Sequence, residues 1–246
     1  MDYKIIELKS TLSTNLFAQE LLLHEKVEEG TVVWASEQIK GRGLGNNFWE
    51  SEAGKNLTIS VILRPDFLAA RDQFMITKIV SLGLIDFLNS FGNLHGINIK
   101  WPNDVYVGLK KIAGTLIECD IKGNSIEHVI AGIGLNLNQE RFYSDAPNPV
   151  SVKNLIHTDI SVSSSLESVL YYIGLRYRQL KEKLYDRINS DYLENLLFYK
   201  SFHQYLSKGN RFNGAIADVD SFGKLQILTD EGELKSFEMK DICFIL

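Results

Sequence analysis

The order of apolar and polar positions divides the first part of the chain into strands and two helices. Runs rich in β-branched and apolar residues predict strands at 3–8, 31–36, 57–63, 97–101, 105–108, 114–121 and 127–138. Apolar residues recur at helical spacing from Leu16 to Leu22 and across residues 72–91, so both segments are predicted to be helices. Ser13 or Thr14 is expected to cap the first of them.

The last strand of that series carries two glycines, Gly132 and Gly134. Glycine inside a strand weakens it, and it usually marks a bend or a place where other groups approach the backbone closely. A bend or a close approach is therefore expected between residues 127 and 138.

The pattern changes in the last third of the chain. Apolar residues from Leu166 to Leu184 fall on one helical face, and a second helix is predicted over residues 191–200. After residue 210, short apolar runs alternate with turn residues, which predicts four strands in about forty residues. We expect these strands to form a small β-barrel. The predicted domains are therefore residues 1–200 and 201–246.

Composition narrows the classes of protein that fit. The chain has 246 residues, 45% of them hydrophobic, which is enough for a full core. Its formal net charge of -5 argues against a general nucleic-acid-binding surface. The 2 cysteines are far apart in sequence, and they indicate neither a disulfide framework nor a metal site. No apolar run approaches the roughly 20 residues that span a bilayer, so a cytoplasmic location without membrane contact is expected.

Residues 41–49 form a glycine-rich segment that holds one cation. Gly41, Gly43 and Gly45 give the backbone freedom to wrap closely around a ligand, and its free amides can bind oxyanions. Arg42 lies between the first two glycines, and its planar guanidinium suits a carboxylate or a phosphate. Taken alone, this segment is better explained as an ordinary surface turn.

A second segment of chemical interest reads Lys-Trp-Pro-Asn-Asp from Lys100. Pro102 restricts the backbone, so Asn103 and Asp104 leave the strand at a defined angle. An amide beside a carboxylate can hold a metal-bound phosphate or orient a nucleophile, although Pro-Asn-Asp also suits a simple turn. Lys111 follows closely, so two lysines flank one carboxylate, which favours a functional site.

Two other polar groups stay ambiguous on sequence grounds alone. Asn136 and Asn138 point to the same side of an alternating strand, where they can line a pocket or face solvent. Ser13, Thr14 and Asn15 are most simply a helix cap, and alternatively they present hydrogen-bonding groups to a small polar ligand.

Together these segments resemble the biotin protein ligases. The resemblance covers residues 5–140 most strongly, and the segment after residue 200 looks like the small terminal barrel of that family. The matching elements, in the order of the family, are Ser13-Thr14-Asn15, Gln38, Gly41-Arg42-Gly43, Trp49, Lys100-Trp101-Pro102-Asn103-Asp104, Lys111-Ile112-Ala113-Gly114 and Gly132-Ile133-Gly134-Leu135-Asn136.

The resemblance implies an α+β fold of the class II synthetase-like, biotin and lipoate ligase type. Its sheet is expected to be mixed and mostly antiparallel, flanked by helices and followed by a small SH3-like β-barrel. It also implies a two-step reaction, in which biotin and ATP with magnesium give biotinyl-5′-AMP and pyrophosphate. Biotin then passes to one lysine of a biotin carboxyl carrier domain of a biotin-dependent carboxylase.

The resemblance also assigns roles to residues. Those implied in catalysis are Lys111, Arg42 and Asp104. Those implied in biotin binding are Ser13, Thr14, Asn15, Gln38, Arg42, Gly43, Leu44, Lys111 and Gly114. Those implied in binding ATP or the adenylate are Arg42, Trp49, Lys100, Asn103, Asp104, Lys111 and Asn136. No protein ligand for a metal is implied, because magnesium would enter on the ATP phosphates.

Two departures from the family pattern bear on function. Many relatives carry further arginines directly after Gly-Arg-Gly, where this chain has Leu44 and Gly45, so retention of the adenylate is expected to depend more on Arg42 and Lys111. Regulatory members carry a winged-helix domain before the element that matches Ser13. Only 12 residues precede Ser13 in this sequence, so the single-function type without DNA binding is expected.

Several alternatives remain open at this stage. A lipoate ligase or related acyltransferase shares the sheet and the catalytic lysine, and a non-catalytic sensor of biotin or nucleotide would keep the pocket. Chance similarity of turns in an unrelated soluble α/β domain would explain poorly why so many segments match the family in order. Asp104 can accept the proton of the acceptor lysine or serve the metal and nucleotide. The sequence identifies neither the acceptor carboxylase nor a homodimer, which exposed sheet edges would permit.

Overall fold

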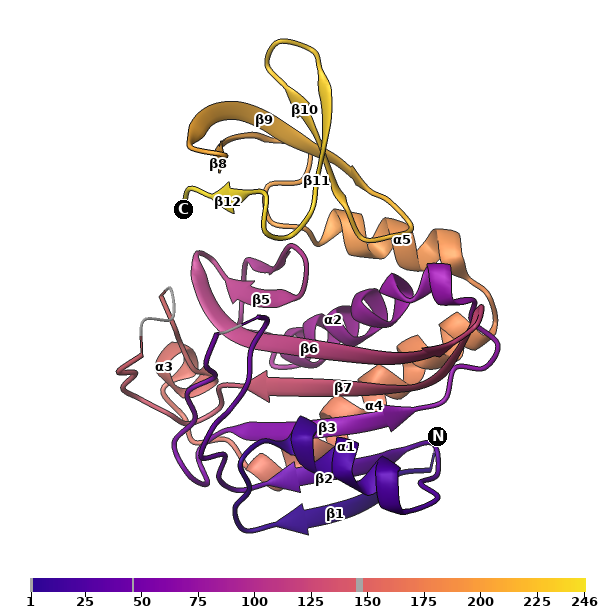
Figure 1. Cartoon of the computed structure of the whole chain (residues 1–246). Coiled ribbons are helices and arrows are strands. Elements are labelled where there is room, and N and C mark those ends of the chain that lie inside the picture. The colour runs from indigo at the N-terminus through magenta and orange to yellow at the C-terminus, as the bar shows by residue number, and fades with distance from the viewer. Residues whose placement is uncertain (1, 46, 145–147) are drawn as a thin grey trace.

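The computed structural model describes residues 2–45, 47–144 and 148–246, and a seven-stranded sheet dominates it (Figure 1). The strand order is β1-β2-β3-β7-β6-β5-β4. Its strands are β1 (Lys4–Leu8), β2 (Thr31–Ala35), β3 (Leu57–Leu63), β4 (Ile97–Lys100), β5 (Asp104–Val107), β6 (Lys110–Lys122) and β7 (Ser125–Leu135). The β1–β2 pair is parallel and the other neighbouring pairs are antiparallel. The predicted mixed, mostly antiparallel sheet is therefore confirmed.

Helices cover both faces of this sheet. The helical elements are α1 (Thr14–His24), the short 3-10 helix η1 (Ala70–Asp72), α2 (Phe74–Asn89), α3 (Val152–Ile156), α4 (Val162–Lys181) and α5 (Tyr185–Glu194). Figure 1 shows α1 in front of the sheet and α2 and α4 behind it. Because α2 lies between the sheet and α4, nearly all of its side chains are buried. None of the helices in the described ranges has the length and apolarity to cross a membrane.

Alternation along β3 separates the hydrophobic core from the side of the sheet that faces α1. Leu57, Ile59 and Val61 point into the main core, as the two-residue period of a strand requires. Ser60 points the other way, and its hydroxyl lies 2.8 Å from Thr14 Oγ1 of α1. The face toward α1 therefore carries polar groups near Thr14 beside a smaller apolar cluster that includes Ala18 and Ile62, and the pocket opens at its polar part.

The C-terminal strands form a second, small antiparallel sheet above the large one (Figure 1). Its order is β11-β10-β9-β8-β12, so it has five strands where four were predicted. The strands are β8 (Phe202–Ser207), β9 (Asn210–Val219), β10 (Leu225–Thr229), β11 (Leu234–Phe237) and β12 (Cys243–Phe244). Val219 and Leu225 join the same buried cluster as α2. The division into domains at residue 200, like closure into a barrel, stays a prediction.

The predicted helix over 191–200 is wrong in its bounds. The chain reverses at Lys183, which has φ +58°, and α5 begins two residues later. After Glu194 the chain leaves the helix to bond with β4: Ile99 N donates to Asn195 O at 2.7 Å and Leu197 N donates to Ile99 O at 2.8 Å. Tertiary hydrogen bonds therefore override helical propensity beyond residue 194.

Other boundaries also differ from the sequence prediction. β6 begins at Lys110 instead of residue 114, so Lys111 lies on a strand. β7 runs unbroken through its two glycines and ends at Leu135, three residues before the predicted end. Beyond it, Asn136 N donates to Ile112 O and Asn138 N donates to Lys55 O, both at 2.9 Å. Helix α3 was not predicted.

Close packing of α2 on α4 depends on Gly83. A methyl group at this position would lie 2.7 Å from Ile173 Cγ1 and 3.0 Å from Ile173 Cα. Alanine gains about 1 kcal/mol of helix propensity over glycine, but overpacking costs about 1–3 kcal/mol. Gly83→Ala should therefore lower the free energy of unfolding, measured by denaturant titration.

Gly174→Ala is the matched control on the facing helix. Its added methyl would meet one side chain, that of Tyr3, with the hydroxyl at 3.1 Å, and no backbone of a facing helix. Stability of this control should be unchanged or slightly higher. A Gly83→Ala protein as stable as Gly174→Ala would show that the two helices can separate freely.

Candidate active site

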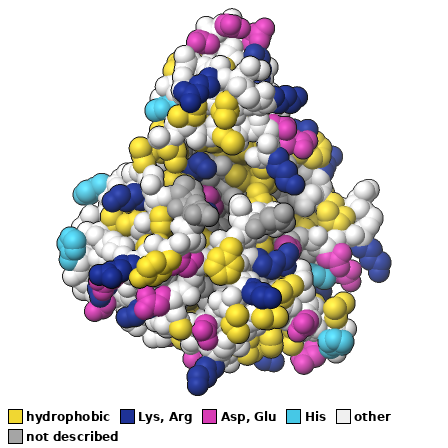
Figure 2. Space-filling model, turned by 60° about the vertical axis from the view of Figure 1, so that its left-hand side comes forward, with side chains coloured by type: hydrophobic (Ala, Val, Ile, Leu, Met, Phe, Trp, Pro, Cys, Tyr) yellow, Lys and Arg dark blue, Asp and Glu magenta, His cyan; other side chains and the backbone are white. Residues whose placement is uncertain are grey.

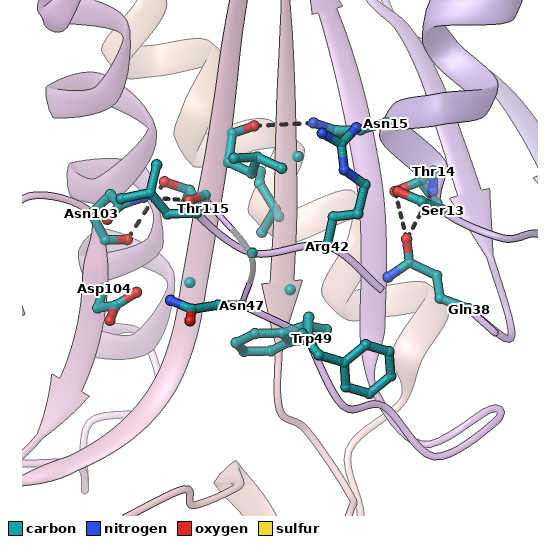
Figure 3. Close-up of a pocket in the computed structure, with 18 of the residues that line it drawn as sticks. Ser13, Thr14, Asn15, Gln38, Arg42, Asn47, Trp49, Asn103, Asp104 and Thr115 are labelled. Atoms are coloured by element: carbon teal, nitrogen blue, oxygen red, sulfur yellow. Dashed lines mark hydrogen bonds between the residues drawn. The ribbon is translucent and has the colours of Figure 1, made fainter. Parts of the chain in front are cut away.

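A pocket opens on the α1 side of the large sheet, and it collects most of the predicted site residues (Figure 3). All of them except Lys100 and Asn136 line it. The predicted residues found here are Ser13, Thr14, Asn15, Gln38, Arg42, Gly43, Leu44, Trp49, Asn103, Asp104, Lys111 and Gly114. Figure 3 shows Asn103 and Asp104 on one side and Ser13, Thr14 and Gln38 on the opposite side. Segments far apart in sequence therefore meet around one space.

One end of the pocket is a hydrogen-bond network at the start of α1. Gln38 Oε1 accepts from Thr14 N at 2.8 Å and from Thr14 Oγ1 at 3.1 Å. Ser13 occupies the N-cap position, but its side chain makes no capping bond, so Gln38 caps the helix instead. Since the Gln38 carbonyl accepts both bonds, its NH₂ group remains a donor at the pocket wall.

Asn15 is oriented by three partners at the same end. Its Nδ2 donates to Glu118 Oε2 at 2.7 Å and to Leu116 O at 3.3 Å, and its Oδ1 lies 2.6 Å from the Ser60 hydroxyl that donates to it. The side chain rests directly on Gly132, where any Cβ would overlap its amide. The predicted close approach at this glycine is therefore confirmed, and the Asn15 side chain has one defined orientation.

The glycine-rich segment folds back on itself over the sheet. Gly43 N donates to Asn47 O at 2.8 Å and Trp49 N donates to Gly41 O at 3.0 Å. Arg42 reaches from this loop to Glu118, with Nη2 3.5 Å from Oε1. The loop prediction included Asn46, which lies outside the described residues. Arg42 is thus held beside the same carboxylate that orients Asn15.

Trp49 lies on bare backbone in the middle of the pocket floor. Gly114 and Gly134 are paired across β6 and β7, and a Cβ on Gly134 would overlap the indole ring. The indole Nε1 is buried and has no hydrogen-bond partner in the described part of the chain. The indole nitrogen faces the backbone of β7, and the planar apolar ring suits stacking against a flat ligand.

Lys111 and Asp104 form the charged pair at the other end. Lys111 Nζ lies 2.7 Å from Asp104 Oδ1 and 5.6 Å from the centre of the Trp49 ring. Asn103 donates to the Thr115 carbonyl through its side chain and accepts from Thr115 N at 3.3 Å through its backbone. These bonds fix the turn against β6, so the ammonium, the carboxylate and the indole have defined positions.

Gln139 holds the residues after the glycine-rich segment in place by hydrogen bonds. This side chain is 1% exposed, and its Oε1 accepts from Glu52 N and from Asn56 Nδ2 while its Nε2 donates to Glu50 Oε1 at 2.9 Å. Burial alone would raise the pKa of Glu50. Hydrogen bonds from the loop after Gln139, including one from Ser144 N, hold this pKa below its ordinary value. These bonds fix Glu50, and they therefore also fix the backbone of the neighbouring Trp49.

Lys100 and Asn136 lie outside the pocket lining. Lys100 lines a second cavity between the two sheets, and its Nζ lies 5.3 Å from the Phe244 ring centre and 5.8 Å from that of Tyr106. Burial lowers the pKa of Lys100, with Asp104 opposing the shift. Asn136 is buried and donates to Val150 O at 3.1 Å. Their assignment to nucleotide binding stays a prediction.

Asp104 lines both cavities, so they meet at this residue. Figure 2 shows the corresponding face of the molecule hollowed below its upper, C-terminal part, with basic, acidic and hydrophobic side chains around the hollow. Asp104 is therefore the wall residue that the pocket and the cavity beside Lys100 share.

Sequence reasoning did not name several residues that shape the site. Ser60, Thr115 and Glu118 were missed, as was the role of Gly132 as the surface beneath Asn15. A signal for Glu118 was available, because it lies four residues after Gly114 on one strand and so points to the same face. No local signal pointed to Ser60, whose importance depends on the pairing of β3 with β7.

The electrostatic arrangement suits an anionic ligand in a site that is not strongly charged. Arg42 and Lys111 are the cations, and each has a carboxylate neighbour, Glu118 and Asp104. An anion would compete with these carboxylates for the cations. Among the described residues, no group of three or more His, Cys, Asp or Glu gathers to hold a metal ion.

Comparison with known proteins identifies relatives of one kind. Residues 7–136 match the Biotin/lipoate A/B protein ligase family. The chain is 25% identical to the bifunctional ligase/repressor BirA of Bacillus subtilis over 258 aligned residues, covering 94% of this chain and 76% of the relative. It is 37% identical over 131 residues to a biotin–[acetyl-CoA-carboxylase] ligase of Paracoccus denitrificans, covering 53% of each chain.

A solved structure agrees over nearly the whole length. The biotin protein ligase of Aquifex aeolicus, solved in complex with biotin and ATP, superposes with a TM-score of 0.79 at 26% identity. The superposition covers 98% of this chain and 97% of the Aquifex chain. The similarity therefore includes both the large sheet and the small C-terminal one.

Proposed function

The chain belongs to the biotin/lipoate A/B protein ligase family, and from this premise we propose that it joins biotin to protein using ATP. Biotin is activated as biotinyl-5′-AMP with release of pyrophosphate. The biotinyl group then passes to a lysine of a biotin carboxyl carrier domain. The Paracoccus relative, named a biotin–[acetyl-CoA-carboxylase] ligase, supports a carboxylase carrier as the acceptor.

One observation carries this proposal: a single pocket holds the groups that both substrates require. The network around Gln38 and Asn15 offers hydrogen bonds to the ureido ring of biotin. Trp49 offers a flat surface for adenine, and Lys111 lies beside it, 5.6 Å from the ring centre. The reacting carboxylate and α-phosphate would therefore meet near Lys111 and Arg42.

The first step needs charge stabilisation more than proton transfer. The biotin carboxylate is already ionised at neutral pH, since carboxyl groups of this kind have a pKa of about 4–5. Its approach to the α-phosphate brings two anions together, and Arg42 and Lys111 would offset that repulsion in the transition state. A carboxylate oxygen attacks phosphorus, the bond to the β-phosphate oxygen breaks, and pyrophosphate leaves.

The second step needs removal of a proton from the acceptor. A free lysine has a pKa of about 10.4, so its ammonium must lose a proton before nitrogen attacks the anhydride carbonyl. Asp104 lies at the junction of the two cavities, and it is the proposed group that accepts or orients this proton. The amide bond forms as AMP leaves.

Magnesium is proposed to enter as a complex with ATP. Asp104, a carboxylate of the pocket, is already paired with Lys111. The ion would supply charge neutralisation on the phosphates. Lys100, in the neighbouring cavity, is the proposed partner for the β- and γ-phosphates, because that cavity meets the first one at Asp104.

The family also contains lipoate ligases, so lipoate is the alternative substrate. The polar network at Gln38 and Asn15 favours biotin, because lipoate has no ureido group to use such hydrogen bonds. A non-catalytic sensor is less favoured, since Lys111 and Arg42 are both present in the pocket. The Paracoccus relative and the Aquifex structure, both named as biotin ligases, support the same choice.

The proposal is tested by incubating the protein with biotin, MgATP and a biotin carboxyl carrier domain. The intact mass of the carrier should rise by one biotinyl group, and no rise should occur without ATP. Parallel reactions with lipoate and a lipoyl domain should give no product. Labelling by lipoate alone would assign the other activity of the family, and pyrophosphate release without transfer would limit the function to activation.

Lys111→Ala should abolish most adenylate formation, because removing one preorganised charge donor costs roughly a hundredfold or more in rate. Pyrophosphate release with biotin and MgATP measures this step. Lys110→Ala is the matched control, since its side chain is exposed on the same strand. Near-normal release from Lys111→Ala, with a folded protein by circular dichroism, would remove Lys111 from the mechanism.

Asp104→Asn should slow transfer to the carrier more than adenylate formation, because the amide cannot accept the lysine proton. Single-turnover transfer from preformed adenylate should fall by about a hundredfold to ten-thousandfold, the range typical of lost general-base catalysis. Pyrophosphate release should fall less. An equal loss in both steps would indicate that Asp104 acts through Lys111 or the nucleotide instead.

Two glycines on β7 allow the ends of the pocket to be tested separately. Gly132→Ala would displace Asn15, and Gly134→Ala would displace Trp49. The first should weaken biotin binding and the second ATP binding, each by about tenfold or more if one ordered contact is lost. Isothermal titration with each substrate measures both. Equal effects of the two variants on both substrates would contradict the proposed arrangement.

A further inference from the structure

The turn that carries Asn103 and Asp104 is held from behind by residues much later in the chain. The hydroxyl of Tyr192, in α5, donates to Pro102 O at 2.6 Å. Tyr192 is fully buried, and its ring meets Phe74 edge to face at 5.9 Å. A buried hydroxyl with a single fixed acceptor is a rigid support for the peptide that leads into Asn103.

A second support comes from the small C-terminal sheet. Trp101 Nε1 donates to Gly223 O at 3.0 Å, and Gly223 lies in the turn between β9 and β10. Gly223 has φ +87°, and a Cβ there would overlap the Phe74 ring. Glycine therefore lets this turn approach closely enough for its carbonyl to accept the indole hydrogen.

The front of the same turn faces the reacting groups. Asn103 is bonded to Thr115 of β6, and Asp104 is paired with Lys111 at 2.7 Å. A shift of Pro102 would move Asp104, and with it the preferred position of the Lys111 ammonium. At the other end of the pocket, Thr14 and Gln38 do not bond to this turn. Asn15 bonds to Leu116 O, next to Thr115, but it is also held by Ser60 and Glu118.

We propose that Tyr192, with the Trp101–Gly223 contact, is a positioning residue for the nucleotide half of the site. It acts through Pro102 on Asp104 and Lys111 and does not touch substrate. The proposal rests on the proposed function and adds a role for α5 and the C-terminal sheet in adenylate formation. Displacement of about 1 Å at reacting groups is enough to slow an enzyme considerably.

Tyr192→Phe removes one hydroxyl and keeps the ring. In the full-length protein, kcat for pyrophosphate release should fall by about five- to tenfold, as expected for one lost buried hydrogen bond. The dissociation constant for biotin should stay within about twofold of wild type, because that end of the pocket is supported separately. Stopped-flow pyrophosphate detection and biotin titration measure the two quantities.

Tyr205→Phe is the matched control. Tyr205, in β8, is also fully buried, but its hydroxyl has no hydrogen-bond partner in the described part of the chain. The Tyr205→Phe variant should have the same kcat and the same biotin affinity as wild type. Trp101→Phe, which removes the other donor, should reproduce the selective loss of kcat and serves as the second variant if Tyr192→Phe is unstable.

Three results would overturn the proposal. The first is an unchanged kcat in Tyr192→Phe and Trp101→Phe. The second is loss of biotin affinity in step with kcat, since general loosening would then explain both. The third is the same kcat loss in Tyr205→Phe. A wild-type protein that releases no pyrophosphate from biotin and MgATP would instead refute the underlying function.

Discussion

Close contact between side chains and bare backbone is the constraint on which this site depends. Gly114 and Gly134 pair across two strands, and Trp49 lies where their side chains would be. Asn15 likewise occupies the space that a side chain at Gly132 would fill. β-Branched residues would form a more favourable sheet here, but they would fill the pocket. The glycines therefore reduce the stability of the strands where Trp49 and Asn15 need the space. The neighbouring strand β3 is buried along its whole length.

The second feature of the site is that its cations have carboxylate neighbours. Arg42 with Glu118 is the more exposed pair, of the kind that contributes about 1 kcal/mol or less to stability, so exchanging Glu118 for a substrate oxygen costs little free energy. The side chains of Lys111 and Asp104 are only 18% and 23% exposed. The pairs also hold the long cationic side chains in the pocket before an anion arrives, which lowers the entropy lost on binding.

Much of this architecture was predictable from local pattern, and the rest depended on pairings that no local pattern contains. The predicted strand at residues 57–63 has the bounds observed for β3, since apolar residues dominate this segment and begin and end it. The end of α5 could not be predicted, because the residues after Glu194 bond to β4, almost a hundred positions earlier. The partners of Asn15 were hidden for the same reason: Glu118 and Ser60 come from separate strands. The family resemblance identified most of the residues that line the pocket, but it did not identify these supporting contacts.

The separation in sequence between the pocket and its rear supports has a consequence for biosynthesis. Every side chain that lines the pocket comes from residues 13–134, whereas Tyr192 and Gly223, which bond to the turn before Asn103, come much later. A ribosome that has translated as far as residue 190 has made the whole pocket lining but neither of these contacts. Domains generally fold as units as they leave the ribosome, so the nascent chain would carry a loosely held turn until its last strands emerge. Both contacts to this turn would then be complete only after Gly223 has emerged.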